Sequence, residues 1–332
     1  MNKIRRIELR SADLGEGMLV KRALPSRHQR MVGAWCFLDH AGPVNFAPGK
    51  GMHVGAHPHT ALQTFTWLID GEVLHKDSLG NELIIRPGQV NLMTAGRGIV
   101  HTEDSVENGG RLHAAQLWIA LPEELADCEP DFAHYPELPV WHSRGVQHTL
   151  LAGAYGDLEA PTAVHSAMLG MDLFSEQGGT VNLSLNPDFE YGYLPLTGQV
   201  NVAGETYTPD EFAYLEPGLN KLEMTLGTDS RVLLLGGLPF DAPVQMWWNF
   251  VGHSKEAIAQ AQRDWEMGDA RFGDVSTAAG VAPRLMPPRP TPPSVGRSPA
   301  PPSSRGRGRA RRTRRRPRRR GGRGLVKRTR PR

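Results

Sequence analysis

Two short groups of polar residues in this sequence have the types and spacing of metal ligands, His57-Pro58-His59 and His101-Thr102-Glu103. In a β-strand, residues i and i+2 point to the same face of the sheet. Each group would therefore direct two ligand-type side chains to one side, and strand pairing would bring the two groups together. Three imidazoles and one carboxylate suit a divalent first-row metal ion such as iron, manganese, nickel or zinc.

A single His-x-His group has an ordinary alternative, because such histidines are commonly exposed to solvent or hydrogen-bonded. The second group, on a neighbouring expected strand, favours the metal site. Pro58 cannot donate a hydrogen bond to a strand ladder, which indicates an edge or bulged strand near the mouth of a barrel. Gly96 and Gly98 form a turn that can direct the following strand back into that barrel.

The elements that must position these residues are short strands. Alternating and β-branched patterns predict strands over residues 63–69, 72–76, 82–86 and 89–93, separated by Gly-containing turns. Short strands with frequent turns favour an antiparallel barrel or sandwich. One helix is expected over residues 255–267, with Ser254 as its N-cap and Ile258, Ala261 and Trp265 on one face.

The chain divides into two β domains and a tail. Four prolines spread through residues 122–146 indicate a linker, and a weak repeat relates residues 87–96 to residues 209–218. We therefore expect an N-terminal domain over residues 6–125, which carries the metal site. A second domain is expected over residues 140–275, and a disordered tail rich in Pro and Arg over residues 276–332.

Charge separates the tail from the domains. Of the 332 residues, Ser276 to Arg332 contain 19 of the 38 Lys and Arg and none of the 35 Asp and Glu, so the tail carries +19 and the remainder −16. Three interpretations of the tail stay open. It contacts the phosphates of a nucleic acid nonspecifically, it is an inert solvated extension, or it is translated from a shifted reading frame.

Composition excludes several classes of protein. No stretch approaches the ~18 apolar residues that a membrane-spanning helix needs, and residues 1–20 lack the apolar core of a signal peptide. Only two cysteines occur, which fits a reducing cytoplasm. The acidic domains would repel phosphates and are a poor nucleic-acid surface. We therefore expect a cytoplasmic protein that binds no membrane.

Several motifs together resemble those of the pirin family. The most specific is the stretch MTAGRGIVHTE from Met93 to Glu103, and the resemblance extends over about residues 6–275. Further matches are Gly51 before His57-Pro58-His59, Pro87-Gly88, LHAAQLW from Leu112, Leu121-Pro122, GGLP from Gly236 and WNFV from Trp248.

The resemblance implies a bicupin, two antiparallel β-barrels of the cupin (jelly-roll) type, with one metal ion in the N-terminal barrel and none in the second. The implied ligands are His57, His59, His101 and Glu103, and iron is the usual metal of the family. Bacterial members include enzymes that open the flavonol quercetin with dioxygen. Animal members act in the nucleus as metal-dependent partners of transcription factors.

One residue near the expected site departs from the family pattern. Gln63 stands four residues after His59, where cupins carry Glu, and an amide can hydrogen-bond to a ligand but cannot act as a base. Together with His113 and Gln116, Gln63 is a candidate for the surroundings of the metal or the substrate pocket. His53 and His75 have the same two interpretations as His113, hydrogen-bonding partners of the site or ordinary polar positions.

We therefore expect an iron-dependent oxidoreductase of the quercetin 2,3-dioxygenase type, acting on a flavonol and dioxygen. Glu103 would balance the charge of the metal and accept the flavonol proton. The alternative is a metal- or redox-sensing regulatory protein that binds protein partners and has no turnover.

Overall fold

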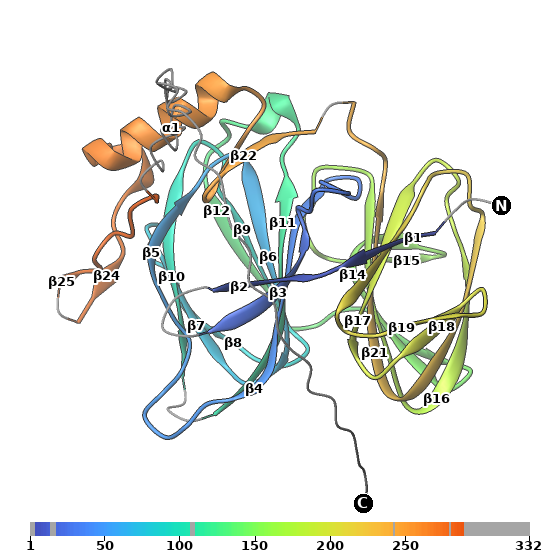
Figure 1. Cartoon of the computed structure of the whole chain (residues 1–332). Helices are drawn as coiled ribbons and strands as arrows, with labels where there is room; N and C mark the ends of the chain where they lie inside the picture. The colour runs from blue at the N-terminus through green and yellow to red at the C-terminus, as the bar shows by residue number, and fades with distance from the viewer. Residues whose placement is uncertain (1–3, 14–17, 107–109, 242, 279, 289–332) are drawn as a thin grey trace, which may run out of the picture. The chain divides into compact units, whose positions relative to one another are not determined.

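The computed structural model describes residues 4–13, 18–106, 110–241, 243–278 and 280–288. Within them the regular secondary structure is almost entirely β-strand, with a single α-helix near the C-terminal end of this range (Figure 1). No helix among these residues has the length and apolar character needed to cross a membrane. Residues 289–332, most of the expected basic tail, lie outside the described residues.

Two antiparallel sheets of the N-terminal half face each other and share a core that includes Val20, Leu68, Val73 and Ile85. The larger sheet consists, in pairing order, of β12 (Asp131–Tyr135), β9 (Val90–Thr94), β6 (Leu62–Asp70), β11 (Arg111–Ala120), β4 (Trp35–Asn45), β3 (Leu19–Leu24) and β2 (Arg10–Asp13). The smaller sheet consists of β5 (His53–His59), β10 (Ile99–Ser105), β7 (Val73–Asp77) and β8 (Glu82–Ile85).

One ten-stranded antiparallel sheet forms most of the C-terminal half. Its main path runs through β1 (Arg5–Glu8), β20 (Glu211–Leu215), β17 (Glu190–Thr197), β21 (Lys221–Gly237), β16 (Met168–Ser184), β14 (Val146–Tyr155) and β13 (Val140–Ser143). β15 (Leu158–Glu159) pairs with β14, and β18 (Val200–Val202) pairs with β19 (Glu205–Tyr207) and β21. The all-β, two-cupin expectation is confirmed, although the described strands form sheets with free ends rather than closed barrels.

The strict alternation of β-strands decides what each half buries. On β6, Thr64 and Thr66 face the space between the two N-terminal sheets, whereas Phe65 and Trp67 join a core cluster shared with the C-terminal half. The Trp67 indole donates a hydrogen bond of 3.2 Å to the Asp172 carboxylate of β16. The C-terminal half therefore packs against the outer face of the larger N-terminal sheet.

Two segments pack against the half of the protein that lies farther away in the sequence. The N-terminal strand β1 pairs with β20 of the C-terminal half. The segment after residue 243 instead contacts the N-terminal half, because Phe250 bridges to Thr60 and packs with Ala56 and Val100 (Figure 1). This segment contains β22 (Gln245–Trp247), β23 (Phe250–Gly252), α1 (Lys255–Met267), a 3-10 turn at Ala270–Phe272, β24 (Ser276–Thr277) and β25 (Gly280–Val281).

Helix α1 begins and ends where the sequence predicts. The Ser254 hydroxyl accepts a hydrogen bond of 3.1 Å from the Ala257 amide, and Gly268 adopts φ 74° at the C-terminal end. Ile258, Ala261 and Trp265 are buried, as their spacing on one face requires.

Two expectations about irregular regions are wrong. The region 122–146, expected to be a linker, contains a 3-10 turn (Glu123–Leu125) and the strands β12 and β13, which extend one sheet of each half. The tail does not start at Ser276, because β24 pairs with β25 and Ala282 is buried. The prolines of residues 122–146 are compatible with strand pairing when they stand beside a strand rather than within it. The described residues after Ser276 are ordered because they pack beside helix α1.

Candidate metal centre and its cavity

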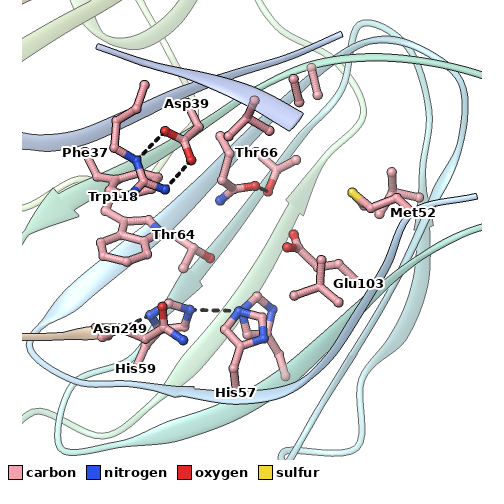
Figure 2. Close-up of a pocket in the computed structure, with 18 of the residues that line it drawn as sticks. Phe37, Asp39, Met52, His57, His59, Thr64, Thr66, Glu103, Trp118 and Asn249 are labelled. Carbon is pink, nitrogen blue, oxygen red and sulfur yellow. Dashed lines mark hydrogen bonds and ion pairs between the residues drawn. The ribbon is translucent and has the colours of Figure 1, made fainter. Parts of the chain in front are cut away.

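Three of the four predicted ligands meet between β5 and β10. These strands pair antiparallel, with His57 opposite His101 and His59 opposite Ile99. Each of the three imidazoles offers a ring nitrogen, and these nitrogens all lie within 4.8 Å of one another. Figure 2 shows His57 and His59 on the same wall of the cavity. All three side chains are buried. The i, i+2 spacing of His57 and His59 therefore brings both rings to one face, where strand pairing adds His101.

The hydrogen bonds of the three rings leave a lone pair on each Nε2 atom. The Nδ1 of His57 lies 2.8 Å from the Gly55 carbonyl oxygen, and the Nδ1 of His59 lies 3.0 Å from the Asn249 carbonyl oxygen. A carbonyl oxygen only accepts hydrogen bonds, so both Nδ1 atoms carry the proton. The Nε2 atoms are then acceptors, as metal-binding imidazoles require.

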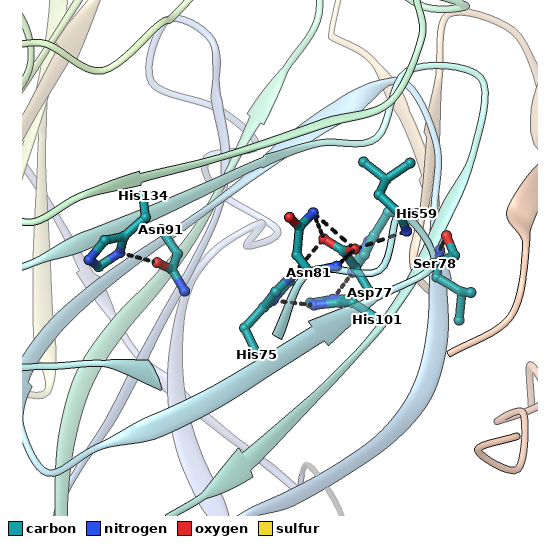
Figure 3. A network of polar contacts seen from close by, with 10 residues as sticks. His59, His75, Asp77, Ser78, Asn81, Asn91, His101 and His134 are labelled. Carbon is teal, nitrogen blue, oxygen red and sulfur yellow. Dashed lines mark hydrogen bonds and ion pairs between the residues drawn. The ribbon is translucent and has the colours of Figure 1, made fainter. Parts of the chain in front are cut away.

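A third hydrogen-bonded chain sets the protonation of His101 (Figure 3). Its Nδ1 lies 3.4 Å from Nδ1 of His75, and Nε2 of His75 lies 3.1 Å from the Asp77 carboxylate. An ionised carboxylate only accepts, so His75 donates to Asp77 through Nε2, and with one ring proton it accepts from His101 through Nδ1. His75 is one of the open candidates of the sequence, and its contact with the site depends on the pairing of β7 with β10.

Burial keeps the three histidines neutral near pH 7. Desolvation lowers the pKa of His57 to about 4 and lowers the pKa values of His59 and His101 well below 6.5, and repulsion from neighbouring imidazoles, including His75, adds to the effect. Neutral imidazoles with free Nε2 lone pairs are the form that binds a cation.

The donor set fits a divalent metal ion. The Nε2 atoms of His59 and His101 lie 3.1 Å apart, and both carry lone pairs by the argument above. Two lone pairs directed at each other repel, and a cation shared between them removes that repulsion. His57, His59 and His101 are therefore suited to hold such an ion, and metal binding would use the arrangement that the strands already impose.

Glu103 lies on the same strand as His101 and lines the same cavity (Figure 2). It is half-buried, and it follows His101 by two residues on β10, which pairs with β7 in regular register, so the two side chains share one strand face. Burial is the main cause that raises the pKa of its carboxyl group. Its oxygens are not part of the tight group of the three histidine nitrogens, so Glu103 stands at the edge of the cluster rather than within it.

A cavity of about 340 Å³ opens above the histidines, between the two N-terminal sheets. Phe37 and Trp118 form one wall as a stacked pair, with ring centroids 4.0 Å apart and planes inclined by 13°. His59 contacts the same Trp118 ring at a centroid distance of 5.0 Å. The volume and the apolar lining are typical of a site for a small organic ligand.

The structure brings only one of the three weaker candidates into this cavity. Gln116 lines it and accepts a hydrogen bond of 2.8 Å from the Thr66 hydroxyl. Gln63 was expected beside the metal, which is wrong, because odd-numbered residues of β6 face the C-terminal half. Its amide nitrogen donates to the Thr94 hydroxyl and to the Ala163 carbonyl oxygen, each at 3.0 Å.

His113 also lies outside the cavity. The cavity-facing residues of β11 include Leu112, Ala114 and Gln116, so His113 points to the opposite face. There its Nε2 lies 2.8 Å from Nε2 of His40, and both rings are buried. Desolvation is the main cause that lowers the pKa of His113 to about 3.

The cavity contains an ion pair that the sequence interpretation missed. Arg22 of β3 donates two hydrogen bonds to Asp39 of β4, at 2.7 and 2.6 Å, and both residues line the cavity. The guanidinium carbon of Arg22 lies 4.4 Å from the centre of the Phe37 ring. Phe37, Asp39 and Ala41 alternate along β4 and share one face. This alternation would have identified Asp39 as a cavity residue if the cavity face of β4 had been known.

Comparisons with known proteins agree with this architecture. Residues 17–119 match the family model described as Pirin, and residues 170–273 match the Pirin C-terminal cupin domain. A Pseudomonas aeruginosa protein named "Putative quercetin 2,3-dioxygenase" is 56% identical over 285 residues, which cover 86% of this chain and 90% of that protein. A Caulobacter vibrioides pirin-like protein is 38% identical over 276 residues, covering 81% of this chain and 94% of its own length.

A solved structure shows the same arrangement. The crystal structure of quercetin 2,3-dioxygenase from Acinetobacter baumannii is 48% identical, with a TM-score of 0.83, and the match covers 86% of this chain and 95% of that chain. Sequence relatives, both domain matches and the fold thus lead to one conclusion. The chain belongs to the pirin family of two-domain cupin proteins.

Proposed function

We propose that this protein is a metal-dependent dioxygenase that opens flavonols of the quercetin type. The observation that carries the proposal is the convergence of three neutral imidazoles, His57, His59 and His101, on a cavity walled by stacked aromatic rings. The relatives named as quercetin 2,3-dioxygenases support the same activity. Iron is the proposed metal, and manganese, nickel and zinc also suit the donor set.

Different residues would bind the ion and the substrate. His57, His59 and His101 would bind the ion through Nε2, and Glu103 would complete the set and reduce its net charge. A bound divalent ion supplies Lewis acidity to a substrate oxygen and orients it toward dioxygen. Phe37 and Trp118 would hold the flat rings of a flavonol against the wall of the cavity.

Glu103 is also the proposed acceptor of the flavonol proton. It is the carboxylate that lines the cavity on the same strand face as His101, whereas Asp39 on the opposite sheet is engaged by Arg22. The apolar side chains around the histidines keep bulk water away, which strengthens the interaction between a carboxylate and a hydroxyl proton. In this proposal, one wall of the cavity would supply the base and the ligands, and the other wall would bind the rings of the substrate.

The test measures metal content and quercetin consumption together. Protein loaded separately with iron, manganese, nickel or zinc should contain about one ion per chain and consume quercetin in proportion to the bound ion. The double variant His57→Ala, His59→Ala should lose both the ion and the activity. Retention of the ion without quercetin consumption, for every metal, would favour the non-enzymatic metal-sensing alternative.

A further inference from the structure

A polar row crosses the wall of the cavity that faces the histidines. Arg22, Asp39, Gln116 and Thr66 lie on the adjacent strands β3, β4, β11 and β6, and each is the register partner of the next. All four line the cavity. Figure 2 shows Asp39 and Thr66 across the cavity from His57 and His59. The rows on either side of it are mostly aromatic or aliphatic and include Phe37, Trp118, Ala41 and Ala114.

The row stands at a defined place relative to the metal-binding residues. The preceding cross-strand row consists of Phe37, Trp118 and Thr64, and its Trp118 ring contacts His59. Successive rows on one face of a sheet are two residues, or roughly 7 Å, apart. A flat ligand that reacts beside His59 and stacks on Trp118 would therefore extend its far edge to the row of Asp39 and Gln116.

The hydrogen bonds within the row determine which ligand group it can accept. Arg22 is engaged by both oxygens of Asp39, so the pair offers no uncompensated positive charge to an anion. The carboxylate oxygens retain lone pairs that can accept a further proton donor. The Gln116 oxygen accepts from Thr66, and its amide nitrogen donates no hydrogen bond within the described part of the chain.

These groups are complementary to a phenolic hydroxyl. A hydroxyl both donates and accepts, so it could donate to Asp39 and accept from the Gln116 amide nitrogen. We propose that the row of Arg22, Asp39, Gln116 and Thr66 selects polyhydroxylated flavonols by binding a ring hydroxyl remote from the reacting centre. This inference rests on the proposed function and deepens it, because it assigns the residues that distinguish one flavonol from another.

The physical basis of the selection is the cost of an unpaired polar group. Asp39 is only 2% exposed and Thr66 only 7%. A ligand without the remote hydroxyl would cover the Gln116 amide nitrogen with carbon and leave it without a water or ligand partner, whereas Asp39 and Thr66 keep the bonds they already make. Sites that hydrogen-bond a substrate hydroxyl reject analogues that lack it for this reason.

The experiment compares two substrates and two variants. Quercetin carries hydroxyls on both of its outer rings, whereas 3-hydroxyflavone retains only the reacting hydroxyl. For the metal-loaded parent protein, kcat/KM should be higher for quercetin. In Gln116→Leu and in Thr66→Val the ratio of kcat/KM for quercetin to that for 3-hydroxyflavone should fall about tenfold. Gln177→Leu, an exposed position on β16, is the matched control and should keep the parent ratio.

The outcomes separate this proposal from the proposed function. Turnover of both flavonols, with a ratio that changes less than twofold in both variants, would overturn the polar row and leave the dioxygenase activity in place. If neither flavonol is consumed, the proposed function is wrong and the row is judged by binding of the same two compounds. Equal changes in affinity for both compounds would then overturn it, and a selective loss for quercetin would support it. Thermal unfolding of each variant verifies that it is folded.

Discussion

The Nδ1 atoms of His101 and His75 lie 3.4 Å apart, and the far nitrogen of His75 lies 3.1 Å from Asp77. His101 is thereby connected to a buried carboxylate through a second imidazole. Asp77 is itself held by Asn81 and by the backbone amide of Leu79. Partners of this kind orient a ligating ring and fix the nitrogen that carries its proton. His75 therefore acts as a positioning residue for His101.

Replacing His75 with Phe should weaken metal binding without removing a ligand. The Phe132 ring stacks on His75, with centroids 4.4 Å apart and planes inclined by 13°, so a phenyl ring can retain the packing. The affinity for the metal should fall about 10- to 100-fold, measured by competition with a chelator. His142→Phe, on the exposed edge strand β13, is the control. Unchanged affinity in His75→Phe would show that the chain through Asp77 has no effect on His101.

Replacing Glu103 with Gln should reduce both metal affinity and turnover. The substitution retains the size of the side chain and removes its negative charge, so the bound cation loses a compensating partner. Quercetin consumption per bound ion should fall further than metal content, because an amide cannot accept the flavonol proton. Asp104→Asn, at the neighbouring half-buried position that pairs with His53, is the matched control. Full metal content and full activity in Glu103→Gln would show that Glu103 is neither a metal ligand nor the proton acceptor.

Gln63→Glu should destabilise the protein rather than improve catalysis. The Gln63 side chain is 1% exposed and donates to the Ala163 carbonyl oxygen, which a carboxylate would repel. We expect a loss of about 1–3 kcal/mol in the free energy of unfolding, measured in urea, with unchanged metal content. Gln177→Glu, on an exposed strand, should leave stability within about 0.5 kcal/mol. An increase in turnover in Gln63→Glu would contradict the position of this residue outside the cavity.

Truncation after Val275 should have a different effect from truncation after Pro288. The Arg284 guanidinium lies 4.4 Å from the centre of the Trp265 ring, and the Leu285 amide donates to the Ala56 carbonyl oxygen at 2.7 Å. Leu285 also lines the cavity. We expect the shorter chain to lose roughly 2 kcal/mol of unfolding free energy and to show a higher KM for quercetin. Equal stability and equal KM in the two truncated proteins would mean that residues 276–288 contribute nothing.

Local pattern alone determined the elements that depend on near neighbours. The i, i+2 spacing of His57 and His59 placed both rings on one strand face, and Ser254 with the spacing of Ile258 and Trp265 predicted helix α1 from its first to its last residue. Both results follow from backbone geometry, which repeats every two residues in a strand and every 3.6 in a helix. The motif resemblance to pirins then supplied the two-cupin architecture, which the domain matches confirm.

Only the tertiary structure decided which face of each strand became the cavity. Alternation states that Gln63 and Thr64 point to opposite sides, but it does not say which side meets the metal ligands and which meets the second half. The packing of the C-terminal half on Phe65 and Trp67 made that choice, so Gln63 lies at the contact with Ala163 while Thr64 and Thr66 line the cavity. Strand pairing likewise brought His75 to His101 and Arg22 to Asp39. Such pairings join residues distant in sequence, and their register depends on the burial of whole strands rather than on local pattern.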